Sequence, residues 1–147
     1  MDSTTSEPSG GSSPEASLAL WHRMVAARDL RDLPTITHPD VVFRSPVTFR
    51  SHSGADALGL VLGAAMQVFG DFAYHRELVT REGTSVALEF IATVGDKQVK
   101  GIDLIRFDPA GLITEFEVLV RPLSGLQALA EAMNSKVGEA LAARGEQ

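Results

Sequence analysis

The sequence predicts an α+β fold, in which helices pack on one face of a curved antiparallel sheet. Apolar residues recur at helical spacing between residues 17 and 69 and again after residue 123, whereas the intervening segment alternates with the period of strands. Three turn signals, Glu82-Gly83, Gly95-Asp96 and Asp108–Gly111, divide that segment into pieces joined as hairpins. Helices, then a meander of strands, then a helix is the element order of an α+β domain.

The first sixteen residues differ in composition from the rest of the chain. Residues 1–16 are rich in Ser, Thr, Gly and Pro and almost free of apolar side chains, so we expect a disordered tail. Residues 17–147 are expected to form a single domain. A chain of that size can bury a hydrophobic core without disulfides or metals.

The helical part is expected to contain two longer helices, a short helix and a short strand. The first helix begins at Ser17, and Asp32 caps a short helix that ends near Ile36. The short strand, "VVFRSP", stops at Pro46, and the next helix runs from Gly54 to Phe69. The apolar face of that helix consists of Leu58, Val61, Leu62, Ala65 and Met66.

The meander is expected to contain four strands, followed by a helix that Ser124 caps. The strands are predicted at Phe72–Arg81, Thr84–Val94, Gln98–Phe107 and Leu112–Arg121. In the first of them, Tyr74 rather than His75 is expected to face the interior, because Phe72, Tyr74 and Leu78 form the more apolar face.

Composition excludes several classes of function. The 147 residues include no cysteine, which rules out disulfides, thiol catalysis and Cys-ligated zinc. A net charge of −6 with scattered basic residues disfavours a nucleic-acid partner. No apolar run approaches the ~18 residues of a membrane span, and the start of the chain does not resemble a signal peptide, so we expect a cytoplasmic protein with no membrane partner. No metal-ligand spacing or phosphate-binding loop is present, so neither a metal nor a cofactor is expected.

Asp103 is the anomaly of the strand region, because it lies between Ile102 and Leu104 in the middle of a predicted strand. If the last hairpin pairs Phe107 with Leu112, Asp103 faces Phe116 and Gly101 faces Val118; the preceding hairpin places Asp103 beside Leu88 or Phe90. Asp103 is then the one charged residue on the inner face. The outer face would carry Glu89, Ile102, Leu104, Arg106, Ile113, Glu115, Glu117, Leu119 and Arg121.

An isolated inner carboxyl has two interpretations. It is either a structural aspartate bonded to a hydroxyl or an amide, or a cavity carboxyl whose pKa burial raises above its usual value of about 3.9. Gly101, two residues earlier on the same face, is expected to leave space for a cavity. We favour the cavity, since isolation of this kind is what perturbs a pKa.

The run "GIDLIRFDPAGLITEFEVLVRPL" resembles the nuclear-transport-factor-2-like superfamily, in particular its SnoaL-like and ketosteroid-isomerase-like branch. The resemblance extends from about residue 18 to residue 133 and implies a cone-shaped fold around a small-molecule pocket. It carries over Asp103 as the protonated acid that donates to an oxyanion, Trp21 in place of the oxyanion-hole tyrosine, and Ser45 in place of the general-base aspartate. Because serine alone is not a base, steroid isomerisation of the usual kind is not implied.

For two other reactions of the superfamily, the sequence has the catalytic residue of one and lacks those of the other. SnoaL-like polyketide cyclases use an aspartate at the position of Asp103, so the resemblance preserves that acid/base. The epoxide hydrolases need an Asp-Arg-Asp set that is absent here, where the last strand has Val118-Leu119-Val120.

The predicted function is therefore a cofactor-independent isomerase, cyclase or lyase acting on a small apolar molecule with a carbonyl or enol. Asp103 is the predicted acid/base and Trp21 is predicted to orient an oxygen. The residues expected to bind substrate are Ser45, Leu58, Leu62, Met66, Tyr74, Phe90, Phe116, Val118 and Val120. The alternative is a binding or scaffold module without chemistry. The mixed outer face of the sheet, as in proteins of similar fold, predicts a two-fold homodimer.

Overall fold

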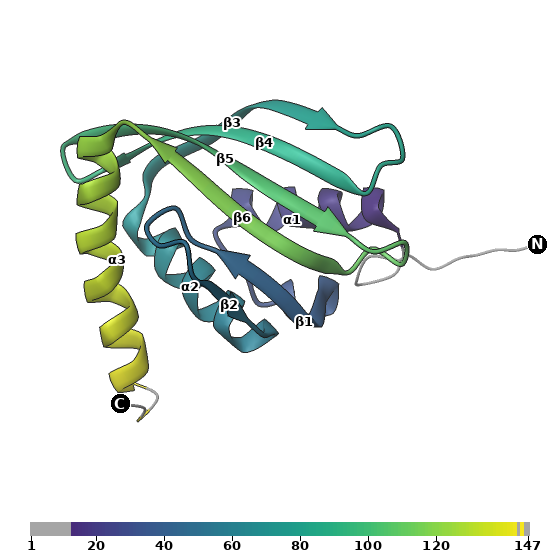
Figure 1. The fold of residues 1–147 in the computed structure, drawn as a ribbon, viewed down its shortest axis with the longest axis horizontal. Coiled ribbons are helices and arrows are strands. Elements are labelled where there is room, and N and C mark those ends of the chain that lie inside the picture. The colour runs from purple at the N-terminus through teal and green to yellow at the C-terminus, as the bar shows by residue number, and fades with distance from the viewer. Residues whose placement is uncertain (1–12, 144, 146–147) are drawn as a thin grey trace, which may run out of the picture.

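The structure, a computed structural model, describes residues 13–143 and residue 145. Its elements, shown in Figure 1, are α1 (Pro14–Ala27), the 3₁₀ helix η1 (Leu33–Ile36), β1 (Thr37–Arg44), β2 (Ser51–Ser53), α2 (Ala55–Val68), β3 (Gly70–Val79), β4 (Ser85–Val94), β5 (Lys97–Phe107), β6 (Ile113–Arg121) and α3 (Leu123–Ala143). The predicted order of helices, meander and final helix is confirmed. The short β2 was not predicted, since its Ser-His-Ser sequence has no apolar alternation.

Helix α1 begins three residues before the predicted start. The Ser13 side chain caps it by accepting a hydrogen bond from the Ala16 amide at 3.1 Å, and Pro14 occupies the first turn, where its missing N–H is not needed. The Ser17 hydroxyl donates to the Gly111 carbonyl at 2.5 Å, which ties the helix to the last hairpin. Residues 1–12 of the expected tail lie outside the described residues.

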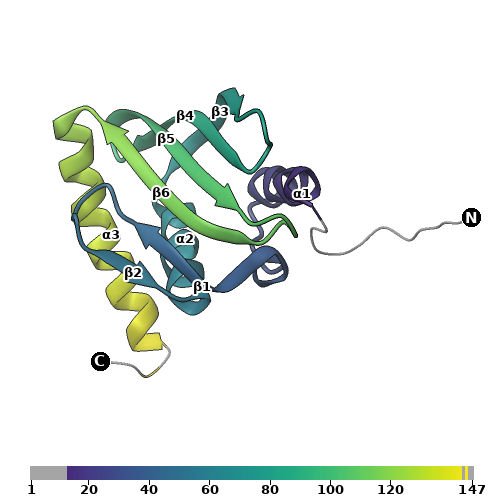
Figure 2. The ribbon, with the colours of Figure 1, turned by 45° about the vertical axis from the view of Figure 1, so that its right-hand side comes forward.

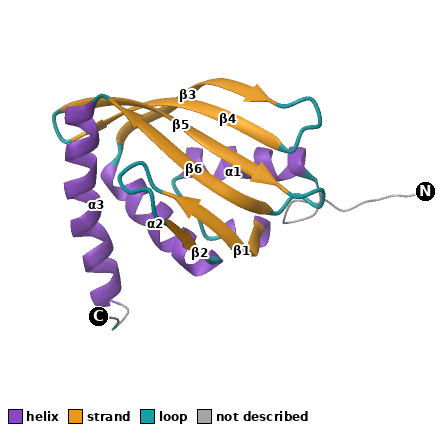
Figure 3. Cartoon of the chain, viewed as in Figure 1, coloured by secondary structure: helices purple, strands orange, loops and turns teal. Residues whose placement is uncertain are grey.

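The six strands form one curved sheet in the order β2-β1-β6-β5-β4-β3. The meander from β3 to β6 is antiparallel, as predicted, but β1 runs parallel to β6, so the sheet is mixed rather than antiparallel throughout. Figures 2 and 3 show α1 and α2 on the same, concave side of the sheet, with α3 standing across one end of it. The two helices therefore close the concave side, where most of the core lies.

The predicted register is right on one side of Asp103 and wrong on the other. Asp103 pairs with Leu88 of β4, as one of the two expected loops requires. On β6 its partner is Val118 rather than Phe116, and Gly101 pairs with Val120 rather than Val118. Two changes add up to this shift: Phe107 pairs with Ile113 rather than Leu112, and a β-bulge at Thr114 adds one residue to β6, which reverses the face of the residue before it. Ile113, expected on the outer face, is consequently buried in the core.

Gly101 does not open a cavity, contrary to expectation. A Cβ at this position would lie 2.4 Å from Cζ of Phe90 and 2.6 Å from the carbonyl oxygen of Leu119. The space is occupied by the Phe90 ring, which is fully buried and stacks on Phe72 with ring centroids 4.7 Å apart. The missing side chain of Gly101 thus serves close packing of β4, β5 and β6. No helix of the described part is long and apolar enough to cross a membrane.

Candidate active site

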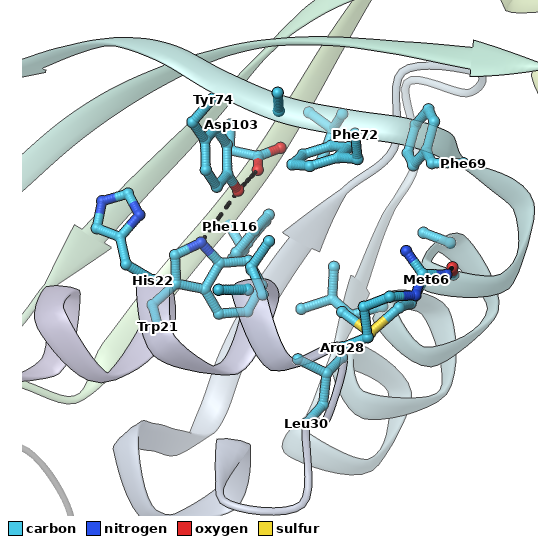
Figure 4. Close-up of a pocket in the computed structure, with 16 residues that line it drawn as sticks. Trp21, His22, Arg28, Leu30, Met66, Phe69, Phe72, Tyr74, Asp103 and Phe116 are labelled. Atoms are coloured by element: carbon cyan, nitrogen blue, oxygen red, sulfur yellow. Dashed lines mark hydrogen bonds between the residues drawn. The ribbon is translucent and has the colours of Figure 1, made fainter.

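A cavity of about 410 Å³ lies between the two concave-side helices and the sheet, and Asp103 forms part of its wall. Most of the wall is apolar, and its contributors come from α1, α2, β3, β5 and β6 (Figure 4). They are Trp21, His22, Val25, Ala26, Arg28, Leu30, Leu62, Ala65, Met66, Phe69, Phe72, Ala73, Tyr74, Asp103, Phe116 and Val118. A cavity of this volume suits a small organic ligand.

Three side chains from three elements form a hydrogen-bonded chain in this wall. The indole Nε1 of Trp21 (α1) donates to the hydroxyl oxygen of Tyr74 (β3) at 3.0 Å, and that hydroxyl donates to Oδ2 of Asp103 (β5) at 2.5 Å. Figure 4 shows both bonds. The indole N–H can only donate, so the Tyr74 oxygen must accept, and its single hydrogen is directed to Asp103. Trp21 therefore fixes the direction of the chain.

Local sequence explains how these groups meet. Trp21 belongs to the buried face of α1 and its ring packs edge-on against Phe116 at 5.3 Å between centroids. Tyr74 pairs with Phe90 and lies on the concave face, as predicted, while His75 points outward to Glu89. Strand β3 bulges immediately after Tyr74, between its pairings at Tyr74 and Arg76. Beyond the bulge the faces are reversed, which turns Leu78 outward and Glu77 toward α1.

The electrostatics of Asp103 follow from its burial. The side chain is enclosed by apolar groups, with 6% of the residue exposed, and this desolvation raises its pKa from the usual 3.8 to about 7. The hydrogen bond from Tyr74 favours the carboxylate and opposes the rise. Burial also raises the pKa of Tyr74 well above its usual value, and the nearby Asp103 carboxylate adds to that rise. Asp103 can therefore change protonation state near neutral pH while Tyr74 keeps its proton.

The second carboxyl oxygen of Asp103 is the chemically available atom. Among the residues that the structure describes, hydrogen bonds reach only Oδ2, and Figure 4 shows the other oxygen on the side of Phe72. With Oδ2 accepting from Tyr74, a neutral Asp103 presents its own O–H from Oδ1. An ionised Asp103 presents an acceptor at the same place. The site can therefore donate a proton to a ligand or take one from it.

Seven of the predicted site residues line this cavity, and four do not. Those that line it are Trp21, Leu62, Met66, Tyr74, Asp103, Phe116 and Val118. Leu58 and Phe90 are not among the wall residues and are fully buried in the core. Val120 packs with the core cluster around Phe90, because the register on β6 is shifted by two residues.

Ser45, expected at the cavity mouth, lies elsewhere. It lines a second, mainly apolar cavity of about 360 Å³ between α2, α3 and the β1–β2 connection, and its hydroxyl accepts from the Val47 amide at 2.9 Å. The two cavities adjoin, because Leu62, Ala65, Phe69 and Val118 line both of them. Ser45, at the position where the resemblance places the base, is therefore not among the residues that line the cavity of Asp103.

Several wall residues were missed by sequence reasoning. Phe72 has the same alternation as Tyr74 and could have been included on that signal, whereas Phe69 was assigned to a helix end. His22 was excluded because it points about 100° away from Trp21 on the helix. It reaches the wall because the bulge in β3 brings Glu77 to within 2.8 Å of its Nε2. Nothing in the pattern indicated that the Arg28 side chain would turn toward α2.

The part of the chain that contains this site matches a known protein family. A family model described as a SnoaL-like domain matches residues 18–116. The chain belongs to the SnoaL-like family. The model ends at Phe116, so it contains all three members of the Trp21–Tyr74–Asp103 chain. No protein with a curated description matches the sequence.

Solved structures resemble the chain in two ranges of identity. A steroid delta-isomerase from Pseudomonas aeruginosa is 51% identical, covers 88% of this chain and 94% of its own, and superposes with a TM-score of 0.86. An uncharacterised bacterial protein with a cystatin-like fold from Silicibacter pomeroyi is 36% identical over 81% of this chain and 83% of its own, with a TM-score of 0.76. The epoxide hydrolase/cyclase-like enzyme SalBIII is 17% identical over 74% of this chain and 89% of its own, with a TM-score of 0.60, and shares the fold.

Proposed function

We propose that this member of the family is a cofactor-independent isomerase or cyclase that uses Asp103 as its acid/base. Its substrate would be a small, mainly apolar molecule with a carbonyl or enol oxygen. The observation that carries the proposal is a carboxyl in the cavity wall with a pKa of about 7, bound at one oxygen by Tyr74, while no hydrogen bond from the described residues reaches the other. A general acid/base is most effective when its pKa lies near the working pH.

A single carboxyl is sufficient for an isomerisation of a double bond next to a carbonyl. The Asp103 carboxylate takes a proton from the carbon between the carbonyl and the double bond, and the electron pair moves to the carbonyl oxygen as a dienolate. The neutral Asp103 then returns the same proton to the far carbon, and the carbonyl is restored. Protons and electrons balance over the two steps, so no cofactor is consumed.

The similarity to a steroid delta-isomerase supports this reaction, and the position of Ser45 defines how it would differ from the usual arrangement. The residue at the usual base position lies in the second cavity, so no carboxylate other than Asp103 lines the first among the described residues. Asp103 would accept and return the proton itself. Tyr74 would stabilise its carboxylate form during the first step.

One observation favours a second candidate, a non-catalytic ligand-binding module. Oxyanion stabilisation by other enzymes depends on a donor aimed at the developing charge, whereas the Tyr74 hydrogen is already given to Asp103. A cavity with one carboxyl and no free donor beside it would still bind an apolar alcohol or ketone. Such a protein would retain a ligand without converting it.

The test is turnover of a β,γ-unsaturated ketosteroid to its conjugated isomer, followed by chromatography. Wild type should convert it, and kcat/KM should rise with pH until about 7, because the reaction begins with the carboxylate. Asp103→Asn, which still accepts from Tyr74, should lose about 10²–10⁴-fold in kcat. Ser45→Ala is the matched control and should retain the wild-type rate.

Two results would contradict the proposal. Equal rates for wild type and Asp103→Asn would remove Asp103 from the chemistry. Tight binding of the ketosteroid without conversion by wild type would favour the binding module.

A further inference from the structure

The cavity has a second polar end, formed by Arg28. This residue follows the last turn of α1, and its Nη2 donates to the carbonyl oxygen of Met66 on α2 at 2.5 Å. The side chain is exposed and thus joins the two helices at a solvent-facing part of the cavity wall. Figure 4 shows the guanidinium beside Met66, well separated from the Tyr74–Asp103 pair.

The backbone of Arg28 is in an uncommon conformation. Its φ of 55° and ψ of 44° are left-handed, and its amide caps the helix by donating to the Met24 and Val25 carbonyls. Helices usually end in this way at a glycine, because a Cβ in the left-handed region approaches the following carbonyl oxygen too closely. A strained backbone that places a long cation against a cavity is a reason to look for a function of the side chain.

The charge of Arg28 is not balanced by a neighbouring carboxylate. Asp29, the adjacent residue, binds Arg31, with the Nη2 to Oδ2 distance at 3.0 Å. No carboxylate of the described residues lies within ion-pair distance of Arg28. The other basic side chain of the wall, His22, already pairs with Glu77. The one carboxyl of the wall, Asp103, is neutral below a pH of about 7. The field at this end of the cavity is therefore positive.

We propose that Arg28 binds the carboxylate of the ligand, so that the natural substrates are apolar carboxylic acids with their carbonyl or enol at the other end. Nη2 holds the Met66 carbonyl, and no described protein atom accepts from Nε or Nη1, which leaves a pair of donors for an incoming carboxylate. The inference rests on the proposed function only in taking this cavity as the substrate site.

Calorimetry with matched pairs of ligands tests this assignment. Each pair consists of a phenol with a para carboxylate and the same phenol with a para carboxamide, in three lengths: hydroxybenzoate, hydroxycinnamate and a biphenyl with the groups at opposite ends. The full chain is titrated at a pH of about 6, where Asp103 is protonated. For the length that spans the cavity, the acid should bind roughly five- to tenfold more tightly than its amide. High salt (~0.5 M) should reduce that ratio.

Two variants separate a ligand contact from other effects of the charge. Arg28→Gln should abolish the preference for the acid and leave the affinity for the amide unchanged within about twofold. Arg23→Gln removes the same charge from an exposed position of α1 that does not line the cavity, and it should keep the wild-type preference.

Four outcomes would overturn the assignment. These are equal binding of acid and amide by wild type, no binding of any pair, an equal loss of both in Arg28→Gln, and an equal effect of Arg23→Gln. An equal loss of both ligands would show that Arg28 only joins the two helices. The measurement involves no turnover, so a failure of Asp103 as acid/base would appear in the kinetics of Asp103→Asn and would leave the acid preference in place.

Discussion

The two oxygens of the Asp103 carboxyl have different surroundings, and the sequence could predict only part of this. Isolation of a charged residue on an apolar strand face indicated a cavity and a raised pKa. The hydroxyl that holds Oδ2 could not be assigned, because Tyr74 lies on a strand whose pairing is interrupted by bulges. Trp21 was expected to reach Asp103 or a ligand and instead reaches the tyrosine oxygen. Of the two interpretations of Asp103, the structural one describes Oδ2, which accepts from Tyr74, and the reactive one describes Oδ1.

From the raised pKa of Asp103 we predict how the free energy of unfolding depends on pH. Between pH 3.8 and about 7 the folded protein binds a proton that the unfolded chain has released, so this group lowers the free energy of unfolding as pH rises through that window. A shift of this size corresponds to roughly 4 kcal/mol at pH values of about 8. Asp103→Asn should therefore be more stable than wild type at a pH of about 8, and nearly equal to it at about 4, in urea unfolding.

The stability difference between Asp103→Asn and wild type is compared at the two pH values. This comparison needs no further control, because effects of the substitution that do not involve ionisation contribute equally at both. A variant that is less stable than wild type at the higher pH would show that Asp103 is an ionised, fully satisfied structural residue. The assignment of an acid/base role would then be abandoned.

At the scale of the elements, two bulges account for most differences between expectation and structure. Ideal alternation predicts the faces correctly along all of β5, from Glu115 onward on β6 and up to Tyr74 on β3. Each bulge then reverses the pattern, which buries Ile113 and brings Glu77 to His22. A bulge leaves little trace in a single sequence, since one extra residue can be accommodated at many places. Of the helices, α2 was predicted to within one residue at each end, whereas the cap and proline that begin α1, Ser13 and Pro14, had been assigned to the tail.

The contact between Gly101 and Phe90 makes a prediction at this scale. Gly101→Ala would place a methyl group 2.6 Å from the Leu119 carbonyl, which belongs to the backbone and cannot move aside as a side chain can. We expect a loss of about 1–3 kcal/mol in the free energy of unfolding, measured with urea. Gly63→Ala is the matched control, because nothing lies within 4 Å of its Cβ position on α2. It should gain about 0.5–1 kcal/mol from helix propensity. A stability of Gly101→Ala equal to wild type would refute the close contact.

At the scale of the whole molecule, the outer face of the sheet combines apolar and charged groups. Leu78, Ile91, Leu104 and Leu119 are each between 39% and 58% exposed there. Among them lies Glu89, which forms ion pairs with His75, Arg76 and Lys100. Such a mixture is typical of a surface between subunits. The charged groups form ion pairs within one chain, whereas the exposed apolar side chains would be covered by a second subunit. We propose that two copies pair through this face.

Sedimentation velocity at micromolar concentration tests the pairing. Wild type should sediment as a dimer. Leu119→Glu places a carboxylate near Glu117 at the centre of the face and should give monomers, because like charges would be buried together. Leu123→Glu changes a leucine that is still more exposed, at the start of α3 and away from the sheet face, and should remain dimeric. Wild type that is monomeric under these conditions would contradict the proposal.

The chain contains one tryptophan and one tyrosine, and they are hydrogen-bonded to each other in the wall of the cavity. The intrinsic fluorescence of the protein above the phenylalanine background therefore originates entirely at the site, from an indole whose N–H is engaged by the hydroxyl that also holds Asp103. A ligand that enters, or a proton that leaves Asp103, changes the environment of that single emitter. Occupancy and ionisation of the site can thus be recorded in the native protein, without a label and without knowing the reaction.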